Sequence, residues 1–163
     1  MKTALELVVR LAQWLTAGLF MGIFVLSVLQ VVLRYLIGMS MLWAPDLLRL
    51  MFVWMVFLGA AILYARNGHL GVDVLVAKLA PAGRKIAAIL VELMALGFFL
   101  ILIFKGWEIA MRRMRIPFDT WDVPTGYAYL SISVTAVLMF VIGLDRLFDI
   151  LRGKSLSERE NVN

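Results

Sequence analysis

The sequence predicts an all-α integral membrane protein with four transmembrane helices and short amphipathic interfacial helices. Apolar residues make up 63% of the 163 residues, charged residues make up 17%, and the mean hydropathy is +0.94. Soluble domains average about 45–50% apolar and about 25% charged residues. Four apolar stretches are also long enough to cross the hydrocarbon core, which takes about 20 residues. We therefore expect a single membrane domain, residues 1–163.

The first predicted span covers residues 11–33, because this stretch contains no charge and Arg34 ends it. The apolar side chains of residues 5–12 recur at helical spacing. This pattern predicts a short amphipathic helix that lies at the membrane surface before the span.

The second predicted span covers residues 47–65 and includes Arg49, whose long side chain can reach the interface. Residues 72–80 then carry an apolar stripe, and Pro81 and Gly83 follow it. This pattern predicts a helix lying in the interface.

The third predicted span covers residues 86–104 and is interrupted only by Glu92, and its helical pattern continues to Met114. The fourth covers residues 123–144, with Asp122 as its expected N-cap. With four spans, both termini lie on the same side of the membrane.

The basic residues predict which side that is, because Lys and Arg accumulate in cytoplasmic segments. The side that holds both termini carries ten of them: Lys2, Arg10, Arg66, Lys78, Arg84, Lys85, Arg146, Arg152, Lys154 and Arg159. The other side carries six: Arg34, Arg49, Lys105, Arg112, Arg113 and Arg115. Both termini are therefore predicted to be cytoplasmic.

The sequence has no signature of an enzyme. It contains no cysteine and one histidine, His69, so it predicts no metal site, and a membrane haem held by paired histidines is excluded. It contains no phosphate-binding loop and no catalytic triad, so we expect no catalytic residue and no cofactor. The basic residues lie between apolar spans and not on one face of a soluble domain, which argues against a nucleic-acid partner.

Glu92 is a candidate functional residue, because carboxylates inside membranes often bind protons or cations. The alternative is structural: a carboxylate near the interface that pairs with Arg84, Lys85 or another subunit. We favour the structural interpretation, since the spans hold no second acid. Trp43, Asp46 and Arg49 share a helix face, which suits a helix cap with an aromatic anchor or a subunit contact.

Residues 30–79 resemble the small membrane subunit, the DctQ-like small permease, of tripartite ATP-independent periplasmic (TRAP) transporters. The stretch reads QVVLRYLIGMSMLWAPDLLRLMFVWMVFLGAAILYARNGHLGVDVLVAKL. The matching elements, in order, are Arg34-Tyr35, Trp43, Asp46, Arg49, Gly59-Ala60-Ala61, Arg66, His69 and Val72-Asp73. The family has two acidic residues shortly after the tryptophan, whereas here Pro45 precedes a single acid, Asp46.

The resemblance implies a non-catalytic subunit of a sodium-driven symporter for organic acids in the bacterial inner membrane. In such heteromeric complexes a periplasmic solute-binding protein captures the substrate, and a large multi-span membrane subunit carries it inward. The small subunit anchors and stabilises the large subunit among the membrane lipids. Sodium and substrate are then expected to bind in the large subunit. The matched residues Arg34, Trp43, Asp46, Arg49, Arg66, His69 and Asp73 become candidates for the subunit interface or a structural motif.

The alternative function is a small, self-sufficient homodimeric exporter of drugs or ions that uses Glu92 as its coupling acid. Such exporters are shorter and carry their key glutamate in the first span, where this chain has none.

Arg112, Arg113 and Arg115 lie on the predicted periplasmic side, against the general charge rule. Three uses compete: binding lipid phosphates, pairing with the nearby acids Glu108, Asp119 and Asp122, or docking the solute-binding protein.

Overall fold

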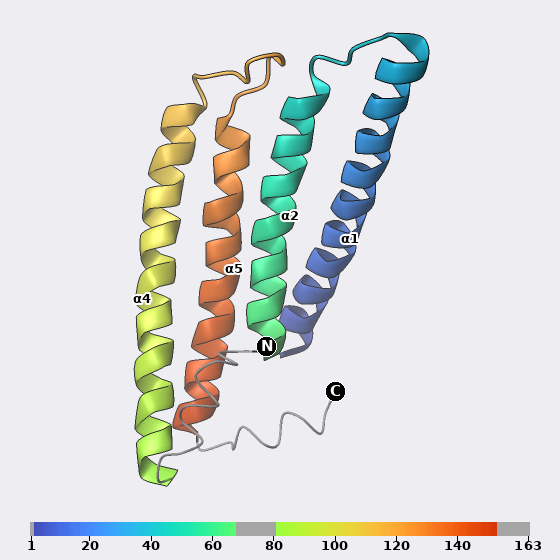
Figure 1. The fold of residues 1–163 in the computed structure, drawn as a ribbon. Helices are drawn as coiled ribbons and strands as arrows, with labels where there is room; N and C mark the ends of the chain where they lie inside the picture. Colours follow the sequence, from blue (N-terminus) through green and yellow to red (C-terminus); the bar gives the residue numbers. More distant parts are fainter. Residues whose placement is uncertain (1, 68–80, 153–163) are drawn as a thin grey trace.

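The computed structural model describes residues 2–67 and 81–152, which form four long α-helices (Figure 1). These helices are α1 (Lys2–Val32), α2 (Ala44–Asn67), α4 (Pro81–Arg113) and α5 (Gly126–Leu151), and a π-helical turn, η1 (Leu33–Ile37), follows α1. Each long helix is apolar and long enough to cross a membrane. The predicted all-α membrane fold is therefore confirmed. The interfacial helix predicted at residues 72–80 lies outside the described residues.

The helices form a row in which the spatial order differs from the chain order. α1 packs on α2, α2 packs on α5, and α5 packs on α4 (Figure 1). α1 starts and α5 ends at the same end of the row, which we call the terminal end. The opposite end, which we call the loop end, holds η1, the start of α2 and the connection between α4 and α5 (Figure 1).

Small side chains allow α4 and α5 to pack closely. A Cβ atom added at Gly126 would lie 2.6 Å from the backbone oxygen of Ala110, and one at Gly106 would lie 2.7 Å from Ser133 Oγ. Ser133 in turn donates a hydrogen bond to the Ile103 carbonyl at 3.3 Å. Helix contacts inside membranes depend on such close packing, because lipid supplies no hydrophobic drive for helices to associate.

α1 is one continuous helix, so the predicted surface helix before the first span is wrong as a separate element. Leu5 and Val9 pack against the cluster formed by Tyr64, Phe99 and Ile142, and Ala12 is buried. Leu5, Val9 and Ala12 therefore face neighbouring helices, whereas Val8 is exposed. η1 ends at Ile37 and is followed by its C-cap residue Gly38, whose φ of 75° is the left-handed conformation that favours glycine.

The connection between α4 and α5, residues 114–125, is a short hairpin. The Phe118 N–H donates to the Val123 carbonyl at 2.9 Å, and the Thr125 N–H donates to the Ile116 carbonyl at 2.8 Å. α5 consequently starts at Gly126, with Thr125 at the N-cap position, and the prediction of Asp122 as the N-cap is wrong. α4 ends at Arg113, close to the predicted Met114.

Candidate functional site

At the loop end, Asp46 joins the first turn of α2 to the α4–α5 hairpin. One carboxylate oxygen, Oδ2, accepts hydrogen bonds from the Thr120 N–H at 2.9 Å and from the Thr120 hydroxyl at 2.6 Å. The Asp46 residue is 8% exposed. A carboxylate at a helix N-terminus also complements the helix dipole. Asp46 therefore fixes the hairpin onto the start of α2.

The other loop-end residues of the matched motif lie on the surface. Arg34 in η1, Trp43 before α2 and Arg49 in α2 are all exposed. The expected local pair of Asp46 with Arg49 is not among the salt bridges within 4.0 Å of residues 2–67 and 81–152. Asp46 uses Thr120 as its hydrogen-bond partner instead.

A buried polar cluster lies toward the terminal end. The Tyr64 hydroxyl of α2 donates a 2.5 Å hydrogen bond to Glu92 Oε1 of α4, and Glu92 is 3% exposed. Arg146 of α5 donates to the carbonyls of Tyr64 and Ala65 at 2.6 and 3.0 Å. Its guanidinium also lies 4.8 Å from the Tyr64 ring centroid. Arg146 thus caps carbonyls in the last turn of α2, which lack partners within their own helix.

This cluster is tightly packed. A Cβ atom added at Gly143 would lie 2.8 Å from Tyr64 Oη and 3.1 Å from Glu92 Oε1. The cluster therefore joins three helices, and the space beside Gly143 is too small for one added methyl group. The expected pairing of Glu92 with Arg84 involves a side chain outside those that the structure describes.

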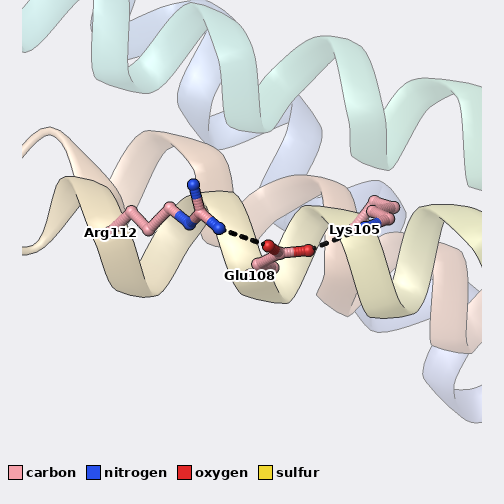
Figure 2. Close-up of polar contacts among 3 residues, drawn as sticks. All are labelled: Lys105, Glu108 and Arg112. Carbon is pink, nitrogen blue, oxygen red and sulfur yellow. Dashed lines mark hydrogen bonds and ion pairs between the residues drawn. The ribbon is translucent and has the colours of Figure 1, made fainter.

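The three arginines near the hairpin lie in different surroundings. Glu108 bridges Lys105 at 2.9 Å and Arg112 at 2.6 Å along the surface of α4 (Figure 2). Arg113 instead lies 5.7 Å from the Tyr129 ring centroid of α5. Arg115 is exposed. Local pairing therefore applies to Arg112 with Glu108, while Arg113 faces a neighbouring helix. The salt bridges of the described residues do not include Asp119 or Asp122.

Arg113 and Arg49 line a cleft of about 320 Å³ between α2, α5 and the hairpin. Asp119, Thr125 and Tyr129 also line it. Polar and apolar side chains therefore line this cleft together at the loop end.

The remaining predicted residues belong to the opposite end or to undescribed positions. Arg66 is exposed in the last turn of α2, at the terminal end. His69 and Asp73 lie outside the described residues. Within residues 2–67 and 81–152, no three His, Cys, Asp or Glu side chains come close enough to hold a metal ion.

Thr120, Tyr64 and Arg146 were not predicted as site residues. Each of these residues forms a hydrogen bond with a residue at least 28 positions away in the sequence. The i, i+3 and i, i+4 spacings of a helix therefore could not predict these pairs. A polar side chain within an apolar helix was the available signal for Tyr64 and Arg146, because such groups require a partner in a membrane.

Comparison with known proteins decides the family. Residues 23–153 match the family described as "Tripartite ATP-independent periplasmic transporters, DctQ component". The chain belongs to this family. It is therefore a TRAP transporter small permease, which is a transporter component and not an enzyme. Between the two functions considered from the sequence, the family match favours the transporter subunit over the exporter.

Individual relatives agree with this assignment. The small permease is 30% identical over 134 residues to a Haemophilus influenzae protein described as a TRAP transporter small permease, covering 80% of this chain and 83% of that one. It is 36% identical over 109 residues to the C4-dicarboxylate TRAP transporter small permease protein DctQ of Vibrio cholerae, covering 64% of this chain and 47% of that one. It is 25% identical over 132 residues to the sialic acid TRAP transporter permease protein SiaT of H. influenzae, covering 80% of this chain but 21% of that protein.

Proposed function

We propose that this small permease is the non-catalytic membrane subunit of a sodium-driven, binding-protein-dependent secondary transporter for organic acids. It anchors and stabilises the large transport subunit in the bacterial inner membrane, with both of its termini in the cytoplasm. The names of its relatives support the substrate class, since C4-dicarboxylates and sialic acid both carry carboxylate groups.

The match to SiaT is the observation that carries the proposed partnership. About four fifths of this chain match a segment that makes up 21% of a much longer permease protein. Two membrane segments joined in one chain are held together permanently, so the same segments as separate chains are expected to bind each other. The partner proposed here corresponds to the remainder of that longer protein.

The buried polar cluster supports placing the transport path in the partner. The Tyr64 hydroxyl bonds to Glu92, and both side chains lie so close to Gly143 that a methyl group there would clash with them. The outer faces of α1 and α4 are instead lined with exposed apolar side chains, among them Phe20, Phe24, Met94 and Phe104. Such faces suit lipid or a membrane partner and not a polar solute.

The test has two steps: a pull-down with the tagged small permease, and then the restoration of uptake in weakened variants by joining the two subunits in one chain. An affinity tag on the small permease is expected to co-purify a large multi-span membrane protein from native membranes. Asp46→Ala and Arg49→Ala are expected to lower its yield, since we propose that Arg34, Trp43, Asp46 and Arg49 organise the contact. Joining the two subunits in one chain, as in SiaT, should restore uptake in the weakened variants.

Restored uptake in the joined chain would support an anchoring role. If the variants remain inactive when joined, the small permease takes part in the transport cycle itself. If the tagged protein brings down no large membrane protein, the proposed complex is wrong.

We further propose that the solute-binding protein approaches the loop end, where Arg112, Arg113 and Arg115 lie. Of these, Arg115 is exposed and makes no salt bridge within the described parts of the chain. Exposed charges of this kind raise association rates and are screened by salt.

A further inference from the structure

We propose that the loop-end cleft binds a membrane phospholipid, with the phosphodiester between Arg49 and Arg113. The proposal depends on the chain being a membrane protein and not on the transporter function proposed above. Its first basis is the position of the two arginines. Arg49 lies in the second turn of α2 and Arg113 ends α4, so both lie near the same end of the row, where lipid headgroups meet the helices.

The second basis is that the two arginines of the cleft have N–H donors available for a ligand. A guanidinium carries five N–H donors, which suit the oxygens of a phosphate. The salt bridges among the described residues involve neither arginine. Arg113 instead lies 5.7 Å from the centroid of the Tyr129 ring, and a guanidinium that stacks on a ring keeps its N–H donors for other partners.

The third basis is charge. The lining contains two positive side chains, Arg49 and Arg113, and one negative side chain, Asp119, so the lining itself carries one net positive charge. The nearby carboxylate of Asp46 is hydrogen-bonded to Thr120. A single phosphodiester carries one negative charge and would balance the charge of the lining. An anionic phospholipid is therefore favoured over a doubly charged soluble anion.

The fourth basis is the gradient of polarity along the cleft. Arg49, Val53 and Phe57 follow one another at four-residue spacing on α2, so they line one face of the helix. Phe57 lies about 12 Å further along the helix than Arg49, at roughly 1.5 Å per residue. Ile132 of α5 lines the cleft as well. The polar end thus suits a headgroup, and the apolar wall that runs toward the middle of the membrane suits an acyl chain.

The size of the cleft fits part of a lipid. Its volume of about 320 Å³ is at the lower end of ligand-binding clefts, which span about 300–1,000 Å³. The headgroup and the start of one acyl chain would fill it. The remaining hydrocarbon would lie along the outer faces of α2 and α5.

The experiment measures lipid retention by native mass spectrometry. The full-length chain is purified in mild detergent and titrated with phosphatidylglycerol, phosphatidylcholine or inorganic phosphate. We expect one phosphatidylglycerol bound more tightly than phosphatidylcholine, and no retained phosphate. Replacing both arginines by glutamine should weaken phosphatidylglycerol binding about tenfold or more, because the phosphate would lose its hydrogen bonds to two charged donors.

Two further variants control for charge and folding. Arg10→Gln with Arg152→Gln removes two exposed charges from the terminal end and should leave binding unchanged. Arg49→Lys with Arg113→Lys keeps the charges but removes the planar fork, and it should give intermediate affinity. If wild type and the double-glutamine variant retain the same amount of phosphatidylglycerol, the proposal is wrong. Retention of inorganic phosphate would identify an anion site instead. Unchanged lipid binding together with loss of a co-purifying membrane subunit would likewise overturn the proposal and leave the cleft as a protein contact alone.

Discussion

Asp46 and Thr120 are 74 positions apart in the chain, yet both donors of Thr120 bond to the same carboxylate oxygen. This pair connects the beginning of α2 to the hairpin that precedes α5. It therefore fixes the loop end of two helices that pack together.

Asp46→Ala is expected to lower the melting temperature in detergent by a few degrees, because the partly buried Thr120 N–H loses its acceptor. Thr120→Val should have a smaller effect, since it removes the hydroxyl and keeps the backbone donor. Asp122→Ala is the matched control, because it removes an exposed acid from the same hairpin. Equal melting temperatures for the Asp46 and Asp122 variants would contradict this role.

Gly126→Ala is expected to destabilise the protein by about 1–3 kcal/mol, because the new methyl group would meet the backbone oxygen of Ala110. Gly97→Ala on α4 is the control. A Cβ there meets nothing within 4 Å, so the change should be neutral or stabilising by up to about 1 kcal/mol. Unfolding measured in detergent and urea distinguishes the two. The interpretation of close packing fails if the two alanine variants have the same stability.

Tyr64→Phe is expected to destabilise the protein by about 0.6–2 kcal/mol, the range for hydrogen bonds between membrane helices. Tyr35→Phe removes a hydroxyl from an exposed side chain and should leave stability unchanged. Thermal unfolding of the purified variants provides the measurement. No difference between them would mean that the Tyr64–Glu92 bond contributes nothing measurable.

Glu92→Gln is expected to leave the sodium dependence of uptake unchanged in proteoliposomes that contain the full transporter. The carboxylate is buried in a packed cluster, so a coupling ion is expected to bind in the large subunit. Lower expression would agree with a structural role. A changed sodium stoichiometry would give Glu92 a part in coupling.

Membrane orientation can be measured by cysteine labelling, since the chain has no native cysteine. A cysteine at Asp122, in the hairpin, is expected to react with an impermeant maleimide in intact spheroplasts. A cysteine at Arg152, which follows the end of α5, should react only after lysis. The reverse labelling pattern would place both termini in the periplasm.

The number of helices could be predicted from sequence because a membrane span has a direct compositional requirement. About 20 apolar residues are needed wherever the chain crosses, and no knowledge of neighbours is involved. The ends were less predictable. α5 starts at Gly126 because backbone bonds from Thr125 and Phe118 close the hairpin first, and Asp122 offers no sign of this.

The partners of the polar residues could not be predicted for a physical reason. Asp46 and Arg49 satisfy a helical spacing rule, but the structure pairs Asp46 with Thr120. Helical spacing describes contacts within one helix, whereas the decisive contacts here join different helices. The glycines of α5 were visible in the sequence, but the sequence does not say which helix approaches each one.

The central position of α5 has a consequence for biosynthesis. α5 packs on both α2 and α4, yet it leaves the ribosome after both of them. Until then, the carbonyls of Tyr64 and Ala65 at the end of α2 lack their hydrogen bonds from Arg146. Before α5 is inserted, the first three long helices therefore lack the contacts that join α2 to α4 through α5. A membrane protease that recognises exposed polar groups would therefore cleave a chain truncated before α5 more readily than the full-length chain.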